Sequence, residues 1–421
     1  MSVAPYPEYK DSGVEWIGEI PSHWQQRRLC NYLTERREKV SDKEFPPLSV
    51  TKNGIVPQLD NAAKTDDGDN RKKVCAGDFV INGRSDRKGS SGLSSLEGSV
   101  SLINIVLRAH TAIEMRFVGW LLKSVSFQEE FYRYGKGIVA DLWSTNFSEM
   151  RNIILAMPPV SEQSAIAAFL DQETGKIDAL VAEQERLIAL LKEKRQAVIS
   201  QAVTKGLNPN APMKDSGIEW LGQVPAHWTI TKTSYLFKSA MGQTILAEEL
   251  VEDGEWPVFS ATEGDHYFGR INNPEVRLDA GDIVIPARGN SIGHVKLVKE
   301  PSTTTQTTIY CKLRTSEKVL ARFAYHYFRG CKEWLFYFTQ TAIPQITVRE
   351  VNSNPTLVPP MLEQAEIADF IEDAQTEFDT LITEATQAIT LLRERRAALI
   401  SAAVTGKIDV RSLTPTKQEA A

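Results

Sequence analysis

Two stretches of the chain space their apolar residues as one face of a long helix does. From Glu162 to about Val203 there is no proline and a single glycine, Gly175, and apolar residues recur three and four positions apart. Because the two stretches match in length and register, we predict two helices that pair as an antiparallel coiled coil. Two separate helices, each packed on its own domain, are the alternative. The predicted seam residues are Ile177, Leu180, Gln184, Leu187, Leu191, Lys194 and Val198, and then Phe378, Leu381, Ala385, Ala388, Leu392, Arg395 and Leu399.

Proline and glycine mark the ends of these helices. Two proline pairs, at residues 158–159 and 359–360, stop the preceding strands, since proline has no N–H to donate to a sheet. Gly206 and Gly406 fall where a left-handed residue commonly closes a helix. At about 1.5 Å per residue, each helix would span roughly 60 Å.

The regions before each helix combine strand patterns with one helical pattern. Helical spacing predicts one helix over residues 118–135 and another over residues 320–338. This mixture indicates an α+β fold with a mixed α/β globular domain in each region. The predicted strands cover residues 75–84, 99–108 and 150–159 in the first region and residues 279–288, 303–313 and 353–360 in the second.

The chain repeats itself at a spacing of about 200 residues. Residues 10–24, KDSGVEWIGEIPSHW, return as KDSGIEWLGQVPAHW at residues 214–228. Ala-Gly-Asp followed by an apolar strand also occurs twice, ending at Arg84 and at Arg288. We therefore predict a tandem duplication of a globular domain followed by a long helix. The repeated tryptophans are predicted to pack between elements: Trp16, Trp24, Trp220 and Trp228.

The duplication divides the chain into five segments. If the helices are antiparallel, connectivity predicts a dumbbell, with a globular region at each end of a rod and the C-terminus returning near the N-terminus. The segments are a first globular domain at 1–156, a first spacer helix at 157–206, a second globular domain at 207–357, a second spacer helix at 358–410 and a flexible tail at 411–421.

Composition excludes several classes of protein. A chain of 421 residues exceeds the size of one core, so at least two domains are expected. The four cysteines lie far apart and the six histidines form no HxxxH or HxxEH pair, so neither a disulfide framework nor a zinc site is expected. No signal pattern and no apolar run near the roughly 18 residues of a membrane span occur, which predicts a soluble, cytoplasmic protein without membrane contact.

Charge limits where nucleic acid could bind. The 48 Lys and Arg residues against 54 Asp and Glu residues give a net charge of -6, unlike a general nucleic-acid binder. Residues 357–421 hold 11 acidic and 6 basic side chains, whereas residues 1–155 and 211–356 are close to neutral. Any DNA contact is therefore expected on local patches of those two regions, and the acidic last segment suits a protein partner better.

Motifs of catalysis are missing from the sequence. There is no GxxxxGK[ST] phosphate loop and no GxGxxG after a strand. The proline pairs occur in MPPV and VPPM, without the Asn or Asp and the aromatic residue of an adenine-methyltransferase motif. We therefore predict a protein that is not an enzyme and has no metal site.

Four motifs occur twice in the same order, and together they resemble the specificity subunit of type I restriction-modification systems. They are the KDSG-to-HW phrase, the Ala-Gly-Asp strand ending in arginine, the PPxxEQxxIA helix entry and a long helix ending in Val-Thr. The resemblance covers nearly the whole chain. It implies that each globular region is a target recognition domain for one half of a bipartite site in double-stranded DNA.

The same resemblance implies a division of labour within a complex. The helices would space the two half-sites and bind two methyltransferase subunits, and restriction motor-nuclease subunits would join them. S-Adenosylmethionine, ATP and magnesium would bind those partners, and no cofactor would bind this chain.

Base reading requires donors and acceptors on exposed loops, such as arginine to guanine or asparagine and glutamine to adenine. Glycine-rich stretches at residues 82–92 and 287–294 fit this requirement best. A solvated loop without function is the alternative for each residue. The candidate DNA-binding residues are Asn82, Arg84, Ser85, Arg87, Lys88, Lys136 and Ser144 in the first region and Arg288, Asn290, Ser291, Gln306 and Gln345 in the second.

Two other functions share some of these features. A non-catalytic coiled-coil adaptor holding two protein-binding domains would have the same fold but bind no DNA. A nuclease acting alone would need a carboxylate–lysine constellation, which we do not find in the sequence.

Overall fold

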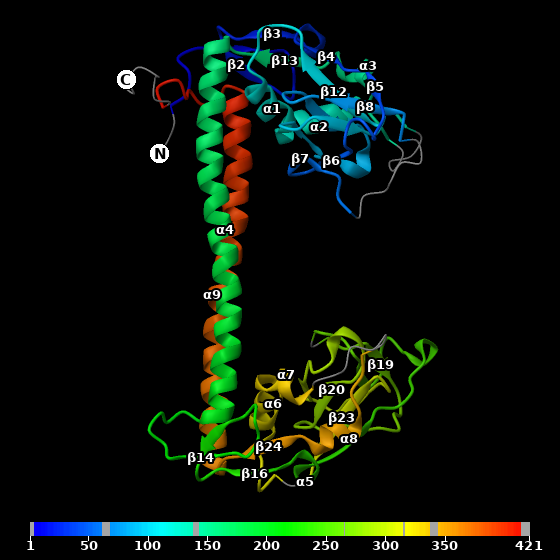
Figure 1. The fold of residues 1–421 in the computed structure, drawn as a ribbon, viewed down its shortest axis with the longest axis vertical. Coiled ribbons are helices and arrows are strands. Elements are labelled where there is room, and N and C mark those ends of the chain that lie inside the picture. The colour runs from blue at the N-terminus through cyan, green and yellow to red at the C-terminus, as the bar shows by residue number, and fades with distance from the viewer. Residues whose placement is uncertain are drawn as a thin grey trace. The chain divides into compact units, whose positions relative to one another are not determined.

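The chain is α+β and divides into two compact units. The computed structural model describes residues 4–60, 68–137, 143–264, 266–314, 316–336 and 344–413. Unit 1 comprises residues 1–184 and 387–421, and unit 2 comprises residues 185–386. Each unit therefore contains one globular region and parts of two long helices, α4 (Val160–Lys205) and α9 (Met361–Val404) (Figure 1).

Unit 1 is built from small antiparallel sheets and short helices. Its helices are α1 (Met115–Lys123), α2 (Val125–Arg133) and α3 (Phe147–Met150), with 3-10 turns η1 (Leu29–Asn31) and η2 (Ser85–Arg87). Its larger sheets have the orders β10 (Ser91–Leu93), β9 (Phe79–Asn82), β12 (Asn104–Ala109), β4 (Leu33–Glu35) and β11 (Gly98–Val100), β8 (Arg71–Val74), β5 (Lys39–Val40). The two-stranded sheets are β1 (Tyr9–Asp11) with β2 (Glu19–Pro21), β3 (Gln25–Arg28) with β13 (Ile154–Met157) and β6 (Leu48–Thr51) with β7 (Gly54–Pro57).

Unit 2 repeats much of this arrangement. Its helices are α5 (Thr233–Leu236), α6 (Ala321–Gly330), α7 (Lys332–Leu335) and α8 (Val348–Ser353), with 3-10 turns η4 (Ala247–Glu249) and η5 (Gly289–Ser291). Its larger sheets have the orders β17 (Phe237–Met241), β23 (Thr308–Leu313), β20 (Ile283–Pro286), β21 (Lys296–Leu297) and β19 (Gly269–Ile271), β18 (Trp256–Phe259), β22 (Thr303–Thr304). The two-stranded sheets are β14 (Met213–Asp215) with β15 (Gln223–Pro225) and β16 (Thr229–Lys232) with β24 (Pro355–Val358).

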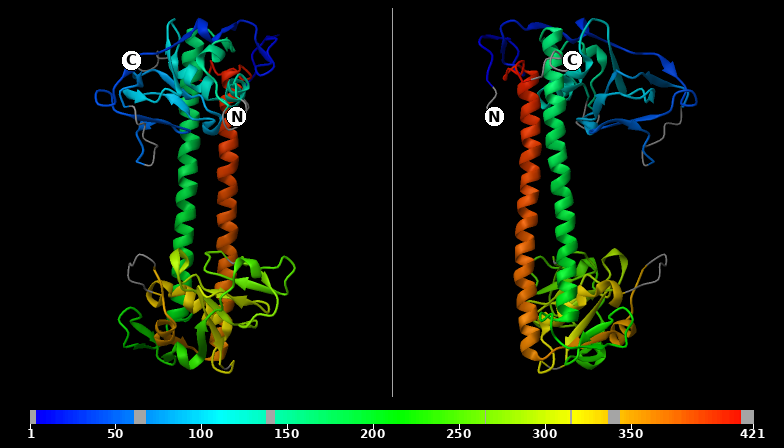
Figure 2. Two further views of the ribbon diagram at one scale, coloured as in Figure 1. Left: turned by 90° about the vertical axis from the view of Figure 1, so that its right-hand side faces the viewer. Right: turned by 60° about the vertical axis from the view of Figure 1, so that its left-hand side comes forward.

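Each unit's core includes the end of a helix that began in the other repeat of the sequence. Ile400, Ala403 and Val404 at the end of α9 are buried in the core of unit 1, and Figure 2 shows this end of α9 beside the start of α4. Ile199, Ala202 and Val203 at the end of α4 are buried in the core of unit 2. The predicted packing of the repeated tryptophans is confirmed: Trp24 and Trp228 are buried, Trp16 lies edge-on to Phe127 and Trp220 stacks on Trp334.

The predicted ends of the long helices are confirmed. Strands β13 and β24 stop directly before the proline pairs, and α4 and α9 begin directly after them. Gly206 has a φ of 74° and Gly406 a φ of 73°, the left-handed conformation that closes a helix. A Cβ on Gly406 would also lie 2.4 Å from Cδ of Pro21, so this position requires glycine for space as well. Within the described part of the chain, no helix is both long and apolar enough to cross a membrane.

Two predicted helices and two predicted strands are broken in the structure. The helix expected over residues 118–135 is interrupted at Ser124. This serine has an extended backbone, and its hydroxyl accepts the N–H of Phe127 and so caps the new helix α2. The helix expected over residues 320–338 is interrupted at Cys331, and its last two residues lie outside the described part. A turn splits the strand expected over residues 99–108 into β11 and β12, and another turn splits the strand expected over residues 303–313 into β22 and β23.

The predicted helix seam is wrong at five of its fourteen positions. The other nine are at least partly buried as predicted, but Leu180, Leu187 and Leu381 keep 48%, 43% and 39% of their surface exposed, and Lys194 and Arg395 are exposed as well. At each of these five positions the next residue along the helix is partly buried instead. Each pair of neighbours is either a leucine with a β-branched residue or two basic residues, so three-four spacing fits either one. The corrected seam residues are Val181, Ile188 and Arg195 in α4 and Ile382 and Arg396 in α9.

Ion pairs join the two long helices within each unit. In unit 1, Arg396 of α9 donates to both carboxylate oxygens of Asp178 in α4, at 2.8 and 3.2 Å. In unit 2, Arg195 of α4 donates to Asp379 of α9 at 2.6 Å. Arg195 and Arg396 occupy equivalent positions in the sequence repeat, as do Asp178 and Asp379. The same pair of residue types therefore joins the helices in both units.

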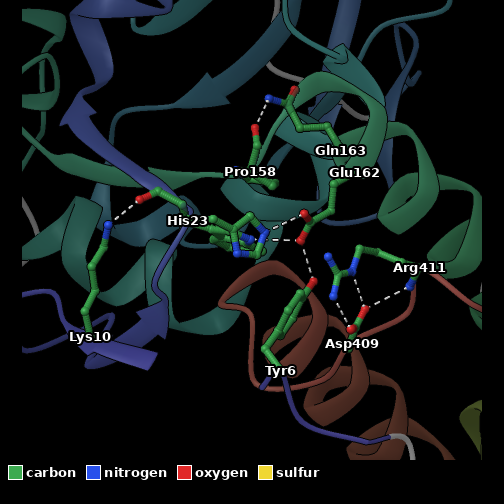
Figure 3. Close-up of polar contacts among 9 residues, drawn as sticks. Tyr6, Lys10, His23, Pro158, Glu162, Gln163, Asp409 and Arg411 are labelled. Carbon is green, nitrogen blue, oxygen red and sulfur yellow. Dashed lines mark hydrogen bonds and ion pairs between the residues drawn. The ribbon is translucent and has the colours of Figure 1, made fainter. Parts of the chain in front are cut away.

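The repeated fifteen-residue phrase packs against the start of the helix in its own unit. Figure 3 shows the carboxylate of Glu162, in the first turn of α4, accepting hydrogen bonds from Tyr6 at 2.5 Å and from His23 at 2.8 Å. The indole N–H of Trp24 also donates to this carboxylate, at 2.8 Å. Burial and the hydrogen bond to Glu162 raise the pKa of Tyr6. In unit 2, His227 donates to the equivalent Glu363 at 2.7 Å. The repetition of the phrase is thus explained by the repetition of a structural joint.

A buried glutamine next to each of these glutamates completes the joint. Gln163 accepts from the backbone N–H of Glu114, which precedes α1, and donates to the carbonyl of Pro158. Gln364 does the same with Leu320, which precedes α6, and with Pro359. Each glutamine therefore ties a short helix of the globular region to the start of a long helix.

The segment after α9 packs against the N-terminal residues of unit 1. The backbone N–H of Asp409 donates to the carbonyl of Ala4 at 2.8 Å, and Val410 is buried. Arg411 is paired with Asp409 at 2.6 Å, and its guanidinium lies 5.1 Å from the centre of the Tyr6 ring (Figure 3). The tail predicted to be flexible begins at this residue, and its positions 414–421 lie outside the described residues.

Removal of the Glu162 carboxylate is expected to loosen unit 1. Glu162→Ala leaves the buried Trp24 indole N–H and the Tyr6 hydroxyl without their acceptor, which costs about 1–2 kcal/mol of stability. The matched variant Glu363→Ala loses only a bond to the half-exposed His227 and is expected to cost less than about 1 kcal/mol. Hydrogen exchange of the amides in residues 6–24 measures the first effect locally. Equal protection losses in both variants would contradict this account of the joint.

Candidate nucleic-acid interface

A buried strand positions Arg84 at the surface of unit 1. All four residues of β9 are buried, and the chain leaves the sheet at Gly83. A Cβ on this glycine would lie 2.6 Å from the carbonyl oxygen of Thr145, so only glycine fits. Arg84 follows in an extended conformation, and the 3-10 turn η2 comes next. The side chain of Arg84 is therefore presented on a short loop fixed by the sheet beneath it.

Backbone hydrogen bonds hold this loop against the segment before α3. Thr145 donates to the carbonyl of Gly83 at 2.9 Å, and Ser85 donates to the carbonyl of Trp143 at 3.0 Å. Ser144 forms isolated β-bridges with both Arg84 and Lys136. The structure thus brings together three of the predicted residues, Arg84, Lys136 and Ser144, from separate parts of the sequence.

The loop in unit 2 has the same construction. Strand β20 is buried, Arg288 is exposed, and the 3-10 turn η5 follows. Arg288 forms an isolated β-bridge with Gln345, and Ile346 donates to the carbonyl of Ala287 at 3.0 Å. These contacts repeat those of Arg84, Ser144 and Thr145 in unit 1. We call the two loops, residues 82–92 and 287–294, the arginine loops.

Two predicted DNA-binding residues of unit 1, Arg84 and Lys136, form ion pairs with nearby carboxylates. Nε of Arg84 lies 3.2 Å from Asp86, with both side chains nearly half exposed, so solvent weakens this pair. Lys136 lies 3.1 Å from Glu149, and a hydrogen bond from Ser148 together with this ammonium lowers the pKa of Glu149. Such exposed pairs can exchange their partners for a phosphate or a base at small cost.

Several predicted residues have structural contacts instead of free donors. Asn82 is buried, and its side-chain oxygen accepts the backbone N–H of Arg84 at 3.0 Å, so it shapes the loop. Ser291 is buried. Lys88 donates to both oxygens of Glu129 at 2.6 and 2.7 Å. Ser85 lies at the start of η2. The direct role of these four residues in DNA binding stays a prediction.

The other predicted residues are exposed. Arg87 lies beside Asp86 at 3.8 Å, and both line a 640 Å³ cavity of unit 1 that also reaches Asn104 and the β6–β7 hairpin. Asn290 and Gln345 are exposed on the second arginine loop and beside it. Gln306 is exposed at the turn before β23, where it accepts a hydrogen bond from Thr244 at 3.0 Å.

The structure adds apolar residues that the sequence did not reveal as part of this surface. Leu102, Ile103 and Trp143 keep 42%, 49% and 40% of their surface exposed beside the first arginine loop. The carbonyl of Ile103 accepts the N–H of Gly83, just as Thr307 accepts that of Ala287 in unit 2. The turn at Leu102 is therefore the counterpart of the turn at Gln306. Leu102 and Ile103 fell inside a predicted strand, so no signal marked them as exposed.

Neither thiol chemistry nor metal binding is supported at these loops. All four cysteines are free, and burial raises the pKa of the Cys311 and Cys331 thiols to about 12. Among the residues that the structure describes, no group of three or more His, Cys, Asp or Glu side chains could hold a metal ion. What the arginine loops offer is exposed guanidinium and amide donors on a fixed backbone.

Comparison with known proteins gives the class of this fold. A family model described as the type I restriction modification DNA specificity domain matches residues 225–391, which include the second arginine loop. The chain is 23% identical to a putative type I restriction enzyme MjaX specificity subunit from Methanocaldococcus jannaschii, over 94% of this chain and 96% of that protein. It is 22% identical to the EcoKI specificity subunit of Escherichia coli, over 80% of this chain and 76% of that protein.

Solved structures agree on the fold. A chain from a structure of the type I R-M system, determined to explain complex assembly and conformational transition, matches with a TM-score of 0.72 at 16% identity, covering 91% of this chain and 98% of that one. The HsdS subunit from Thermoanaerobacter tengcongensis matches with a TM-score of 0.54 at 17% identity, covering 92% and 98%. Residues 225–391 are thus a DNA specificity domain by class. The chain as a whole is similar to type I restriction-modification specificity subunits along most of its length.

Proposed function

We propose that this chain selects the DNA sequence for a type I restriction-modification complex, with unit 1 reading one half of a bipartite site and unit 2 the other. The observation that carries the proposal is the arginine loop, which each unit builds with the same backbone contacts. A guanidinium on such a loop matches the two acceptors of guanine in the major groove. Arg84 and Arg288 would therefore each read a base in a different half-site.

The turn beside each arginine would read a second base. Unit 1 carries Leu102 and Ile103 there, and apolar side chains contact the methyl group of thymine. Unit 2 carries Gln306, whose amide can bond both the N6 amino group and N7 of an adenine in the major groove. The two turns have the same backbone contacts but carry different side chains, which suits two half-sites of different sequence.

We further propose that the chain arose by tandem duplication and that its helices pair as an antiparallel coiled coil. The equivalent ion pairs Arg396–Asp178 and Arg195–Asp379 support this pairing, because each joins a position of one repeat to a position of the other. In this proposal the paired helices set the distance between the half-sites.

The partners in the proposed complex would be two methyltransferase subunits and the restriction motor-nuclease subunits. Exposed leucines on the helices support a protein partner, since Leu187 and Leu190 of α4 and Leu381 of α9 are 43%, 51% and 39% exposed within unit 2. S-Adenosylmethionine, ATP and magnesium would act on those partners. The chain itself would recognise DNA and carry out no reaction.

Binding to a duplex library tests this function directly. The chain is combined with the methyltransferase subunits of its host's type I system, and the complex is passed through a filter that retains protein-bound DNA. Sequencing the retained duplexes should recover one bipartite motif with a spacer of fixed length. Assembly of the complex without retention of any motif would favour the adaptor function instead. Magnesium-dependent cleavage by the chain alone, lost in a point variant, would show an enzyme.

A further inference from the structure

A cavity of 620 Å³ in unit 1 lies between the globular region and the long helices. It is bounded by the turn at Lys52, by Gly89 at the end of the first arginine loop, by the junction of α1 and α2 at Lys123, and by one face of α9. The face of α9 contributes Arg393, Arg396, Ala397 and Ile400, and α4 contributes Asp178. The cavity thus begins where the arginine loop ends.

The lining of this cavity is strongly positive. It contains four cationic side chains and a single carboxylate, Asp178, which is already bonded twice by Arg396. Lys123 donates to the carbonyl of Lys52 at 3.3 Å and forms no ion pair with any described residue. Burial and the nearby positive charge of Arg396 lower the pKa of Lys123. An anion in the cavity would relieve this repulsion.

Unit 2 contains a counterpart of this cavity, with a volume of 230 Å³. Arg329 is the ninth residue of α6, as Lys123 is the ninth residue of α1, and Arg195 takes the place of Arg396 with its bond to Asp379. Gly293, at the end of the second arginine loop, takes the place of Gly89. The other charged residues lining it are Lys332 and Glu263, and His294 also lines it.

The charge of these cavities is preserved between the repeats although the residues differ. Lysine at position 123 corresponds to arginine at position 329, and the neighbouring residues do not match. Lys123 donates to the Lys52 carbonyl, and Arg329 lies over the ring of Tyr325 and donates to its hydroxyl, but neither cation forms an ion pair with a described carboxylate. The fold therefore leaves the positive charge of both side chains without a negative partner. A ligand with negative charge explains both cavities at once.

We propose that each cavity binds a phosphate group of the DNA backbone and so fixes the position of the arginine loop on the duplex. This inference rests on the proposed function. Gly89 lies five residues after Arg84, and Gly293 five residues after Arg288, so the base-reading and phosphate-binding ends belong to one short loop. Phosphate contacts set the register of a protein on DNA, and base contacts then specify the sequence.

The salt dependence of DNA binding tests the proposal. Lys52→Gln changes an exposed turn residue, Lys123→Gln keeps a donor for the Lys52 carbonyl, and Arg329→Gln tests the cavity of unit 2. Each variant is bound to its methyltransferase subunits and titrated with the specific duplex and with a scrambled duplex across a salt series. Each lost phosphate contact should make the negative slope of log K against log salt shallower by about 0.9. The change in slope should be the same on the specific and the scrambled duplex.

A matched charge removal outside the cavities serves as the control. Lys176→Gln removes an exposed cation of α4 that is paired with Glu173 at 2.6 Å, and the slope should stay at its wild-type value. Wild-type slopes in all three cavity variants would overturn the proposal, provided that the wild-type complex prefers its specific duplex. A wild-type complex without any sequence preference would instead refute the proposed function.

Two other occupants are distinguished by the same variants. Saturable binding of inorganic phosphate that Lys123→Gln abolishes, with the DNA slopes unchanged, would assign the cavities to a free anion and overturn the proposal. Loss of the methyltransferase subunits from the variants, again with unchanged slopes for the complex that remains, would assign them to an acidic protein surface. Shallower slopes with an intact complex support binding of a DNA backbone phosphate in the cavities.

Discussion

Arg84→Ala is expected to weaken binding through one half of the DNA site, and Arg288→Ala through the other. The loss of a guanidinium that bonds a guanine costs about 1–3 kcal/mol, which corresponds to roughly a 5- to 150-fold weaker binding constant. Both arginines are exposed on loops that buried strands hold in place. The substitution therefore removes the guanidinium and leaves the backbone of the loop unchanged. The measurement is titration of the methyltransferase complex with duplexes that carry changes in one half-site at a time.

The pattern of losses separates base reading from other roles. Arg84→Ala should make the complex indifferent to one base of the first half-site while the second half-site is read as before. The control Arg108→Ala removes an exposed arginine of β12 in the same unit and should change neither half-site. Equal losses on specific and random duplexes would mean that Arg84 and Arg288 contact phosphates rather than bases.

Lengthening both long helices by four residues is expected to move the preferred spacer by one or two base pairs and to abolish methylation of the original site. Four residues add about 6 Å, slightly more than one helical turn. The ion pair between Arg195 and Asp379 sets where the two insertions must lie. In the proposed antiparallel pairing, Leu191, four residues before Arg195, stands level with Thr383, four residues after Asp379.

The insertions therefore belong between Leu191 and Lys192 in α4 and between Ile382 and Thr383 in α9. The sequence repeat alone suggests the position after Leu392, which would leave the segment between the two insertions out of register. Methylation of a library with fixed half-sites and spacers of every length measures the result. A variant with one insertion only serves as the control and should lose methylation at every spacer. A folded double-insertion variant with an unchanged spacer would show that the helices do not set the distance.

The ends of the long helices were predictable because their signals are local. Proline pairs and closing glycines each act within a few residues, and the structure places them as expected. The seam was not fully predictable, since Leu180 and Val181 fit the same spacing and only the approach of the second helix decides between them. The break at Ser124 was missed because a serine that caps a new helix can equally continue an old one.

The candidate site was likewise predictable only where its sequence signals are local. The arginine loops follow from glycine and arginine directly after a buried strand, and both loops lie where the pattern predicts. The partners of each arginine come from residues 143–145 and 344–346, which only folding brings near. The exposed turn at Leu102 and the cavity at Lys123 depend entirely on such approaches, so no local pattern could identify them.

The most direct test of the central claim is the adenine methylation of a strain that carries this gene, compared with a deletion strain and with the restored gene. The account predicts that one bipartite motif, with a methylated adenine and a spacer of fixed length, is lost on deletion and returns on restoration. It further predicts that restoration with Arg84→Ala returns a motif relaxed at one base of a single half-site. A methylation pattern that is the same with and without the gene, in a strain whose methyltransferase subunits are present and active, would contradict the claim that this chain selects the DNA sequence.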